Sequence, residues 1–189
     1  MHFHVVADHH KCPSPVELTV TEKSMSLSGE SYTITDPEGN VVFKMDGHAL
    51  SIRDKCVLED HHGHAILVAR KKLRSMHERW EACKGEHFDD DKLLFSVKKS
   101  SMVSFKTHLE IFLQGNENDD APDFEVKGNF FQREAQIFHK DQLIAEVKRK
   151  YTVGNVLLDK HTFSVVVFPN VDQAFVAALV IIMDRIHED

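Results

Sequence analysis

The residues with the clearest chemical potential are three short runs of Lys and Arg. They are Arg70-Lys71-Lys72-x-Arg74, Lys98-Lys99 and Lys148-Arg149-Lys150, in a chain whose formal net charge is −7. Clustered Lys and Arg side chains gain about 1 kcal/mol each near an anionic membrane leaflet, and they can bind inositol phosphates. The candidate ligands of a lipid head group are therefore Lys71, Lys72, Arg74, Lys98, Lys99, Lys148, Arg149 and Lys150.

An alternative interpretation of these runs is that they are ordinary solvated ends of strands, which need not adjoin in space. On a strand, side chains alternate between the two faces, so Lys148 and Lys150 should share a face with Glu146.

Metal chemistry has weaker support in the sequence. The chain has 14 histidines, and His61-His62-Gly63-His64 offers imidazoles, but Val68 and Ala69 stand where a cupin-like metal site would need a Glu. The acidic stretches, Asp89 to Asp91 and Asn116 to Asp120, lack the spacing of an EF-hand. We therefore expect no metal and no cofactor, and interpret both groups as solvated turns.

Nucleophilic catalysis has no sequence support either. There is no Gly-x-Ser-x-Gly elbow, and Cys12, Cys56 and Cys83 lie in no recognisable Cys/His context. We expect no catalytic residues and a non-enzymatic protein. Trp80 is interpreted as a packing residue, with Arg79 and Glu81 on the surface or in ion pairs.

The composition narrows the class of protein and its partners. Hydrophobic residues make up 42% and charged residues 28%, as in a soluble globular domain. Direct nucleic-acid binding is not expected, because it normally requires a basic footprint. The odd number of cysteines and the absence of a signal peptide predict a reduced, cytoplasmic location. A peripheral position at the plasma membrane and a nuclear position stay open.

Apolar and polar residues alternate in short segments along most of the chain, and this alternation predicts β-strands. Turn residues follow about every 8–12 residues, the pattern of all-β domains. The expected strands cover residues 16–22, 32–35, 41–45, 50–53, 56–59, 65–70, 80–83, 94–98, 109–113, 124–127, 135–138, 143–148 and 163–168, with a loop or short helical turn between 71 and 79. No linker or repeat divides them, so residues 1–189 are expected to form one domain.

The end of the chain differs from the rest. Ala174 to Met183 are ten consecutive apolar residues, so a helix here would be apolar on every face and must be buried or in a membrane. A membrane span needs roughly 20 residues, which favours a buried helix and no transmembrane segment. Asn170 is the expected N-cap, with Gln173 as in a capping box.

About a dozen antiparallel strands and one wholly apolar helix have an economical arrangement. The sheet closes into a barrel, which removes its edges, and the helix fills the interior. The expected fold is mainly β, a closed barrel around a central C-terminal helix.

The chain closely resembles the plant LURP-one-related family, over nearly its whole length. The matching motifs are Cys12-Pro13-x-Pro15-Val16-x-Leu18, Asp36-x-x-Gly39-Asn40-x-x-Phe43-Lys44, Ser75-Met76-His77-x-Arg79-Trp80-Glu81, Val97-Lys98-x-Ser100-Ser101-Met102, Asp123-Phe124-x-Val126-Lys127-Gly128 and Pro169-Asn170-Val171-Asp172-x-Ala174-Phe175. This domain is similar to the tubby C-terminal domain and to phospholipid scramblases. The resemblance implies a twelve-stranded barrel around a hydrophobic helix.

The resemblance implies less about function. Members of the family are linked to plant defence, and tubby-like proteins bind phosphoinositides. We expect a non-enzymatic domain that binds phosphoinositide or another anionic membrane lipid in signalling. The alternatives are a protein-interaction scaffold for signalling proteins without a lipid ligand, and a scramblase-like or membrane-tethered transcription-regulator role.

Overall fold

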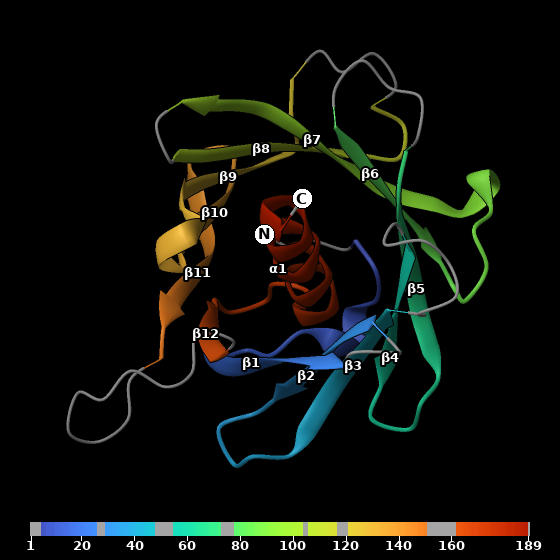
Figure 1. Ribbon diagram of the computed structural model, residues 1–189, viewed down its shortest axis with the longest axis vertical. Coiled ribbons are helices and arrows are strands. Elements are labelled where there is room, and N and C mark those ends of the chain that lie inside the picture. The colour runs from blue at the N-terminus through green and yellow to red at the C-terminus, as the bar shows by residue number, and fades with distance from the viewer. Residues whose placement is uncertain are drawn as a thin grey trace.

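The computed structural model describes residues 5–25, 29–47, 55–72, 78–103, 106–116, 121–150 and 162–188. They form a closed antiparallel barrel around one helix, which confirms the expected fold (Figure 1). The elements are β1 (Val16–Met25), β2 (Gly29–Thr35), β3 (Val41–Gly47), β4 (Lys55–Asp60), β5 (Ala65–Lys71), β6 (Arg79–Lys84), β7 (Leu93–Val103), β8 (Lys106–Leu113), β9 (Phe124–Asn129), β10 (Glu134–His139), β11 (Gln142–Arg149), β12 (Thr162–Val167) and α1 (Gln173–Glu188), with 3₁₀ turns η1 (Asp8–His10), η2 (Asp90–Lys92) and η3 (Phe130–Gln132).

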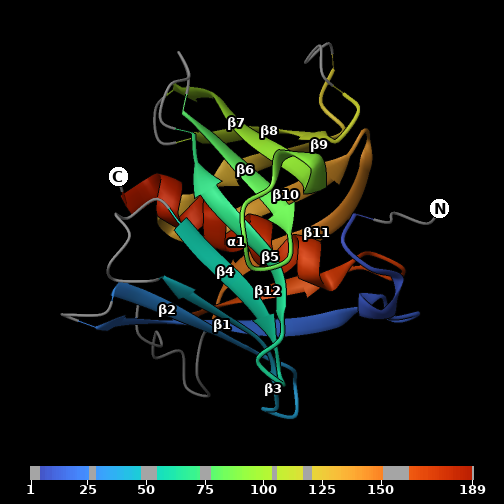
Figure 2. The ribbon, with the colours of Figure 1, turned by 90° about the vertical axis from the view of Figure 1, so that its right-hand side faces the viewer.

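The barrel follows the order of the chain. Each strand pairs with its sequence neighbours, and β1 closes the ring against β12. Successive turns therefore alternate between two ends. We call them the helix N-terminal end, where α1 begins, and the helix C-terminal end, where α1 finishes. Figure 2 shows α1 running through the barrel from one end to the other.

The observed strands overlap closely with the ranges that we expected from the alternation of apolar and polar residues. The expected strand at residues 50–53 lies outside the described residues. β7 is longer than expected, because polar Lys98 to Ser101 continue it to Val103 beyond the apolar segment.

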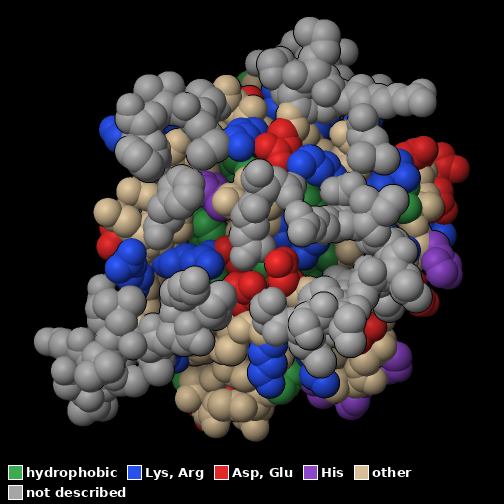
Figure 3. Space-filling model, viewed as in Figure 1, with side chains coloured by type: hydrophobic (Ala, Val, Ile, Leu, Met, Phe, Trp, Pro, Cys, Tyr) green, Lys and Arg blue, Asp and Glu red, His purple; other side chains and the backbone are tan. Residues whose placement is uncertain are grey.

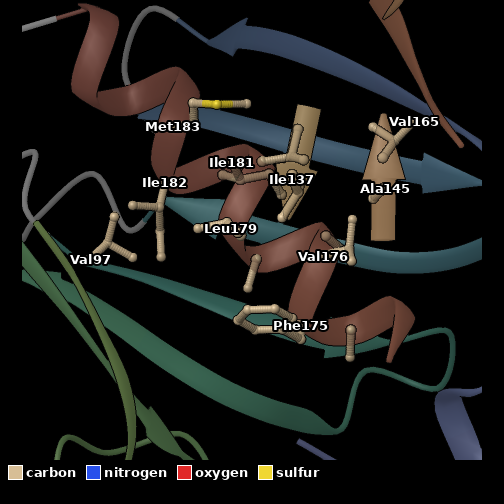
Figure 4. Packing of buried hydrophobic residues seen from close by; sticks show 14 of the residues in the cluster. Val97, Ile137, Ala145, Val165, Phe175, Val176, Leu179, Ile181, Ile182 and Met183 are labelled. Carbon is tan, nitrogen blue, oxygen red and sulfur yellow. The ribbon is translucent and has the colours of Figure 1, made fainter. Parts of the chain in front are cut away.

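The core is the contact between the inward rows of the strands and every side of α1. Each residue from Ala174 to Met183 is at most 3% exposed. Ile181 and Ile182, although adjacent in sequence, point to opposite sides of the barrel, towards Ile137 and Val97 (Figure 4). Burial of this kind contributes roughly 25 cal/mol per Å² of apolar surface, which explains why the helix needs no polar face.

The N-cap of α1 is Asp172, so the expectation for Asn170 is wrong. The Oδ1 atom of Asp172 accepts hydrogen bonds from the N–H groups of Ala174 and Phe175, at 3.1 and 3.2 Å. Asn170 instead lies in the preceding turn with φ of 62°. Asn170 therefore lies two residues before the N-cap, outside the helix.

Charged residues enclose the other end of α1. Asp184 is 1% exposed, forms an ion pair with Arg133 and accepts a hydrogen bond from Tyr32 at 3.1 Å. Arg185 lies 3.1 Å from Glu30. Cations near a helix C-terminus also complement its dipole. Within the described part of the chain, no helix has both the length and the apolar character that crossing a bilayer would require.

Candidate functional site

Two of the three basic runs meet around one carboxylate. Glu78 lies just before β6, between the end of β5 and the middle of β7. Its Oε1 is 3.1 Å from Nζ of Lys71, and its Oε2 is 3.1 Å from Nζ of Lys99. Residues 28 positions apart thus share one anionic partner.

Members of these two runs face opposite sides of the barrel wall. Lys71 pairs with buried Trp80 and therefore lies in the inward row, as Lys99 does opposite Leu109. Lys72 instead reaches Glu81, at 2.7 Å, on the outer wall. Lys98 is opposite Glu110 and also belongs to an outward row. Arg74 lies outside the described residues.

The third run occupies a different side of the barrel, on β11. Lys148 is exposed, and its Nζ lies 2.6 Å from Oε2 of Glu146, on the shared face that the alternation predicts. Lys150 donates to the hydroxyl of Thr19 on β1. The Nε–H of Arg149 donates to the backbone oxygen of Gln132 at 2.6 Å.

All eight described cations of the three runs nevertheless lie towards the helix C-terminal end. The register places the last residues of β5 and β11, the start of β6 and the second half of β7 there. Figure 3 views this end and shows Lys and Arg around its rim, interspersed with Asp and Glu. The three clusters are separate in the sequence, and the topology of the barrel places all of them towards the same end.

The opposite end carries negative charge and histidine. Its turns hold mostly carboxylates: Asp36, Glu38, Asp60, Glu86, Asp89, Asp90, Asp91, Asp123 and Asp141. His61 and His62 are exposed with ring centroids 3.8 Å apart. Over the residues that the structure covers, no three His, Cys, Asp or Glu side chains are arranged to hold a metal ion.

A hollow of about 590 Å³ opens between β9, β10 and β11 near the helix C-terminal end. We call it the β9–β11 hollow. Its charged lining comprises the cations Lys127, Lys148 and Arg149 and the carboxylates Glu134 and Glu146, and the amides of Asn129 and Gln136 complete its polar groups. Specific small-molecule sites commonly have volumes of about 300–1,000 Å³.

One cation of this hollow, Lys127, was missed among the candidate residues. It is alone in sequence, between Val126 and Gly128, so no run of charge marks it. Its Nζ lies 2.9 Å from Oε2 of Glu125, and this hydrogen bond lowers the pKa of the Glu125 carboxyl. Only strand pairing, which places Lys127 opposite Gln136 and Gln136 opposite Glu146, brings it near Lys148.

Comparison with known proteins agrees with this architecture. The LURP-one-related family model matches residues 16–184. The chain is 40% identical to Protein LURP-one-related 15 of Arabidopsis thaliana, over 98% of this chain and 87% of that protein. It is 33% identical to Protein LURP1 of the same plant, over 97% and 90%. An X-ray structure of an Arabidopsis thaliana protein superimposes with a TM-score of 0.76 at 30% identity, covering 97% of this chain and 98% of that one.

Proposed function

The chain belongs to the LURP-one-related family, and from this premise we propose that it is a non-enzymatic domain whose helix C-terminal end binds anionic membrane lipid. The observation that carries the proposal is the common direction of the three basic runs. The resemblance to tubby-like proteins, which bind phosphoinositides, points the same way. A signalling role, with the family's link to plant defence, belongs to this proposal.

The charge distribution supports a defined orientation at a membrane. An anionic surface attracts the basic end and repels the acidic turns of the opposite end. Such steering acts over roughly a Debye length, about 8 Å at 0.15 M salt and about 3 Å at 1 M. Binding by this end should therefore weaken strongly as salt is added.

The local ion pairs limit the expected affinity. Glu78, Glu81 and Glu146 each hold at least one lysine of the basic runs. A lipid phosphate must compete with these carboxylates for the same ammonium groups. Several weak contacts around the rim, acting together, therefore suit this surface better than one tight pocket.

Liposome sedimentation tests the proposal directly. Phosphatidylcholine vesicles with and without phosphoinositide are compared at low and high salt. The double variant Lys148→Glu with Lys150→Glu should lose most of the binding. Its matched control is Lys84→Glu with Lys140→Glu, which makes the same charge change on exposed residues towards the helix N-terminal end and should bind nearly as well as the unmodified protein.

Two results would remove the proposal. One is an absence of vesicle binding at low salt, and the other is an equal loss in both double variants. A protein-interaction scaffold would then be the better reading, and it would retain its protein partners after either charge reversal.

A further inference from the structure

We propose that the β9–β11 hollow binds a polyol carrying a single phosphate, such as an inositol monophosphate, more tightly than the same polyol carrying several phosphates. The phosphate source is either a lipid head group or a free polyol phosphate. This inference deepens the proposed function, and its lipid form rests on that function.

The lining of the hollow suits the two halves of such a ligand. Lys127, Lys148 and Arg149 supply cationic donors for phosphate oxygens. Carboxylates and side-chain amides are acceptors and donors for hydroxyl groups. Glu134, Glu146 and Gln136 line the same hollow, so a ring of hydroxyls beside the phosphate finds partners there. A bare anion would leave the carboxylates unused.

The charge balance sets the number of phosphates. Three cations and two carboxylates give the lining a formal charge of about +1. A phosphomonoester carries about −1.5 to −2 at pH 7, and this lining offsets at least half of that charge. Each additional phosphate brings a similar charge towards Glu134 or Glu146. The two carboxylates should therefore repel polyols that carry more phosphates.

The frame of the hollow is held in place by several independent contacts. Gly128 allows β9 and β10 to approach closely, because a Cβ there would lie 2.3 Å from the backbone oxygen of Glu134. Arg149 ties β11 to the η3 turn through Gln132. Arg133, which follows η3, forms an ion pair with buried Asp184 of α1. A site held this way needs little reordering when a ligand binds.

The lysines of the hollow have contacts that a phosphate can replace. Lys148 forms its ion pair with Glu146, whose other oxygen accepts from Gln136 at 3.3 Å. Lys127 is paired with Glu125, which also contacts His108. Both lysine side chains are more than half exposed, so each can turn to a ligand without unfolding its strand.

Calorimetric titration with inositol monophosphate and with inositol trisphosphate tests the claim on the soluble chain. The unmodified protein should bind the monophosphate more tightly. Lys127→Met and Lys148→Met should each weaken that binding about tenfold, because each removes a charged hydrogen bond. The control Lys84→Met removes an exposed lysine towards the helix N-terminal end and should leave the binding unchanged.

A gain of binding provides the sharper test, because misfolding cannot mimic it. Glu134→Gln together with Glu146→Gln removes both carboxylates and keeps their size. This variant should bind the trisphosphate more tightly than the unmodified protein does and lose the preference for the monophosphate. If the unmodified protein prefers the trisphosphate, or if the double variant gains nothing, the inference is wrong.

Vesicles distinguish the two sources of the phosphate. Phosphatidylcholine vesicles containing phosphatidylinositol, whose inositol ring carries one phosphate, are compared with phosphatidylcholine vesicles that contain phosphatidylserine at equal surface charge. Preference for the first, removed by Lys148→Met, assigns the ligand to a lipid. Binding of soluble monophosphate without any vesicle binding supports a free polyol phosphate and overturns the proposed function alone. Vesicle binding with no soluble binding and no head-group preference overturns this inference alone.

Discussion

At the scale of single residues, Asp172 links the two ends of the chain. Its Oδ2 accepts hydrogen bonds from the N–H groups of Val6 and Ala7, at 2.7 and 3.0 Å, while its Oδ1 caps α1. The side chain is fully buried. One carboxylate therefore fixes the N-terminal segment against the start of the central helix.

Asp172→Asn should destabilise the fold. The new amide keeps one acceptor oxygen but turns an NH₂ group towards two backbone N–H donors, which leaves them unsatisfied. We expect a loss of about 2–4 kcal/mol in the free energy of unfolding, measured by urea titration. Asp141→Asn in the exposed β10–β11 turn is the control and should stay within about 0.5 kcal/mol. Equal stability of the two variants would contradict the role of Asp172.

Stability should also depend on pH through buried histidine. Burial lowers the pKa of His187, whose ring contacts Thr107 at 2.6 Å, and burial also lowers the pKa of His10 and of His139. In the unfolded chain the histidine pKa is about 6.5. Around and below this pH, the unfolded chain therefore binds more protons than the folded chain. The free energy of unfolding should be greatest above about pH 6.5 and decrease as the pH falls below it.

Urea titrations at about pH 7.5 and about pH 5.5 measure this decrease, because the interval spans the unfolded histidine pKa and stays above that of carboxylates. His187→Gln should make the decrease smaller. A free energy of unfolding that is higher at the lower of the two pH values would contradict the role of these histidines.

At the scale of elements, Gly128 shows how closely two strands must approach. A methyl group at this position would lie 2.6 Å from Cα of Ala135 as well as against the Glu134 oxygen. Gly128→Ala should therefore force β9 and β10 apart and cost about 1–3 kcal/mol, by urea titration. Gln136→Ala, on the outer face of β10, should cost less than about 0.5 kcal/mol. A neutral Gly128→Ala would show that the strands can separate freely.

The elements themselves were largely predictable from the sequence, and the site was not. Alternation identifies strands because it is a local property, and ten apolar residues identify α1 for the same reason. The N-cap was misplaced because Asn170 and Asp172 are both good capping residues, and only the backbone of the turn selects between them. The hollow depends on register: Lys127 and Lys148 are far apart in sequence and meet only across β10.

At the scale of the whole molecule, the barrel separates its charges by end. A meander puts alternate turns at opposite ends, so the three basic runs lie towards one end and the acidic turns lie at the other. The helix dipole has the opposite sense, because its negative C-terminus lies among Arg133, Arg185 and the basic rim, which compensate it. Under the proposed function, the basic end faces an anionic membrane.

Fluorescence quenching from the membrane tests that orientation most directly. With Cys12 replaced by Ser, and with Cys56 and Cys83 buried, a probe is attached either at Ser100→Cys or at His62→Cys, exposed positions towards opposite ends. Phosphoinositide vesicles carry a lipid-bound quencher. If the basic end faces the membrane, the probe at position 100 should be strongly quenched and the probe at position 62 only weakly. Equal quenching, or the reverse order, would contradict this orientation.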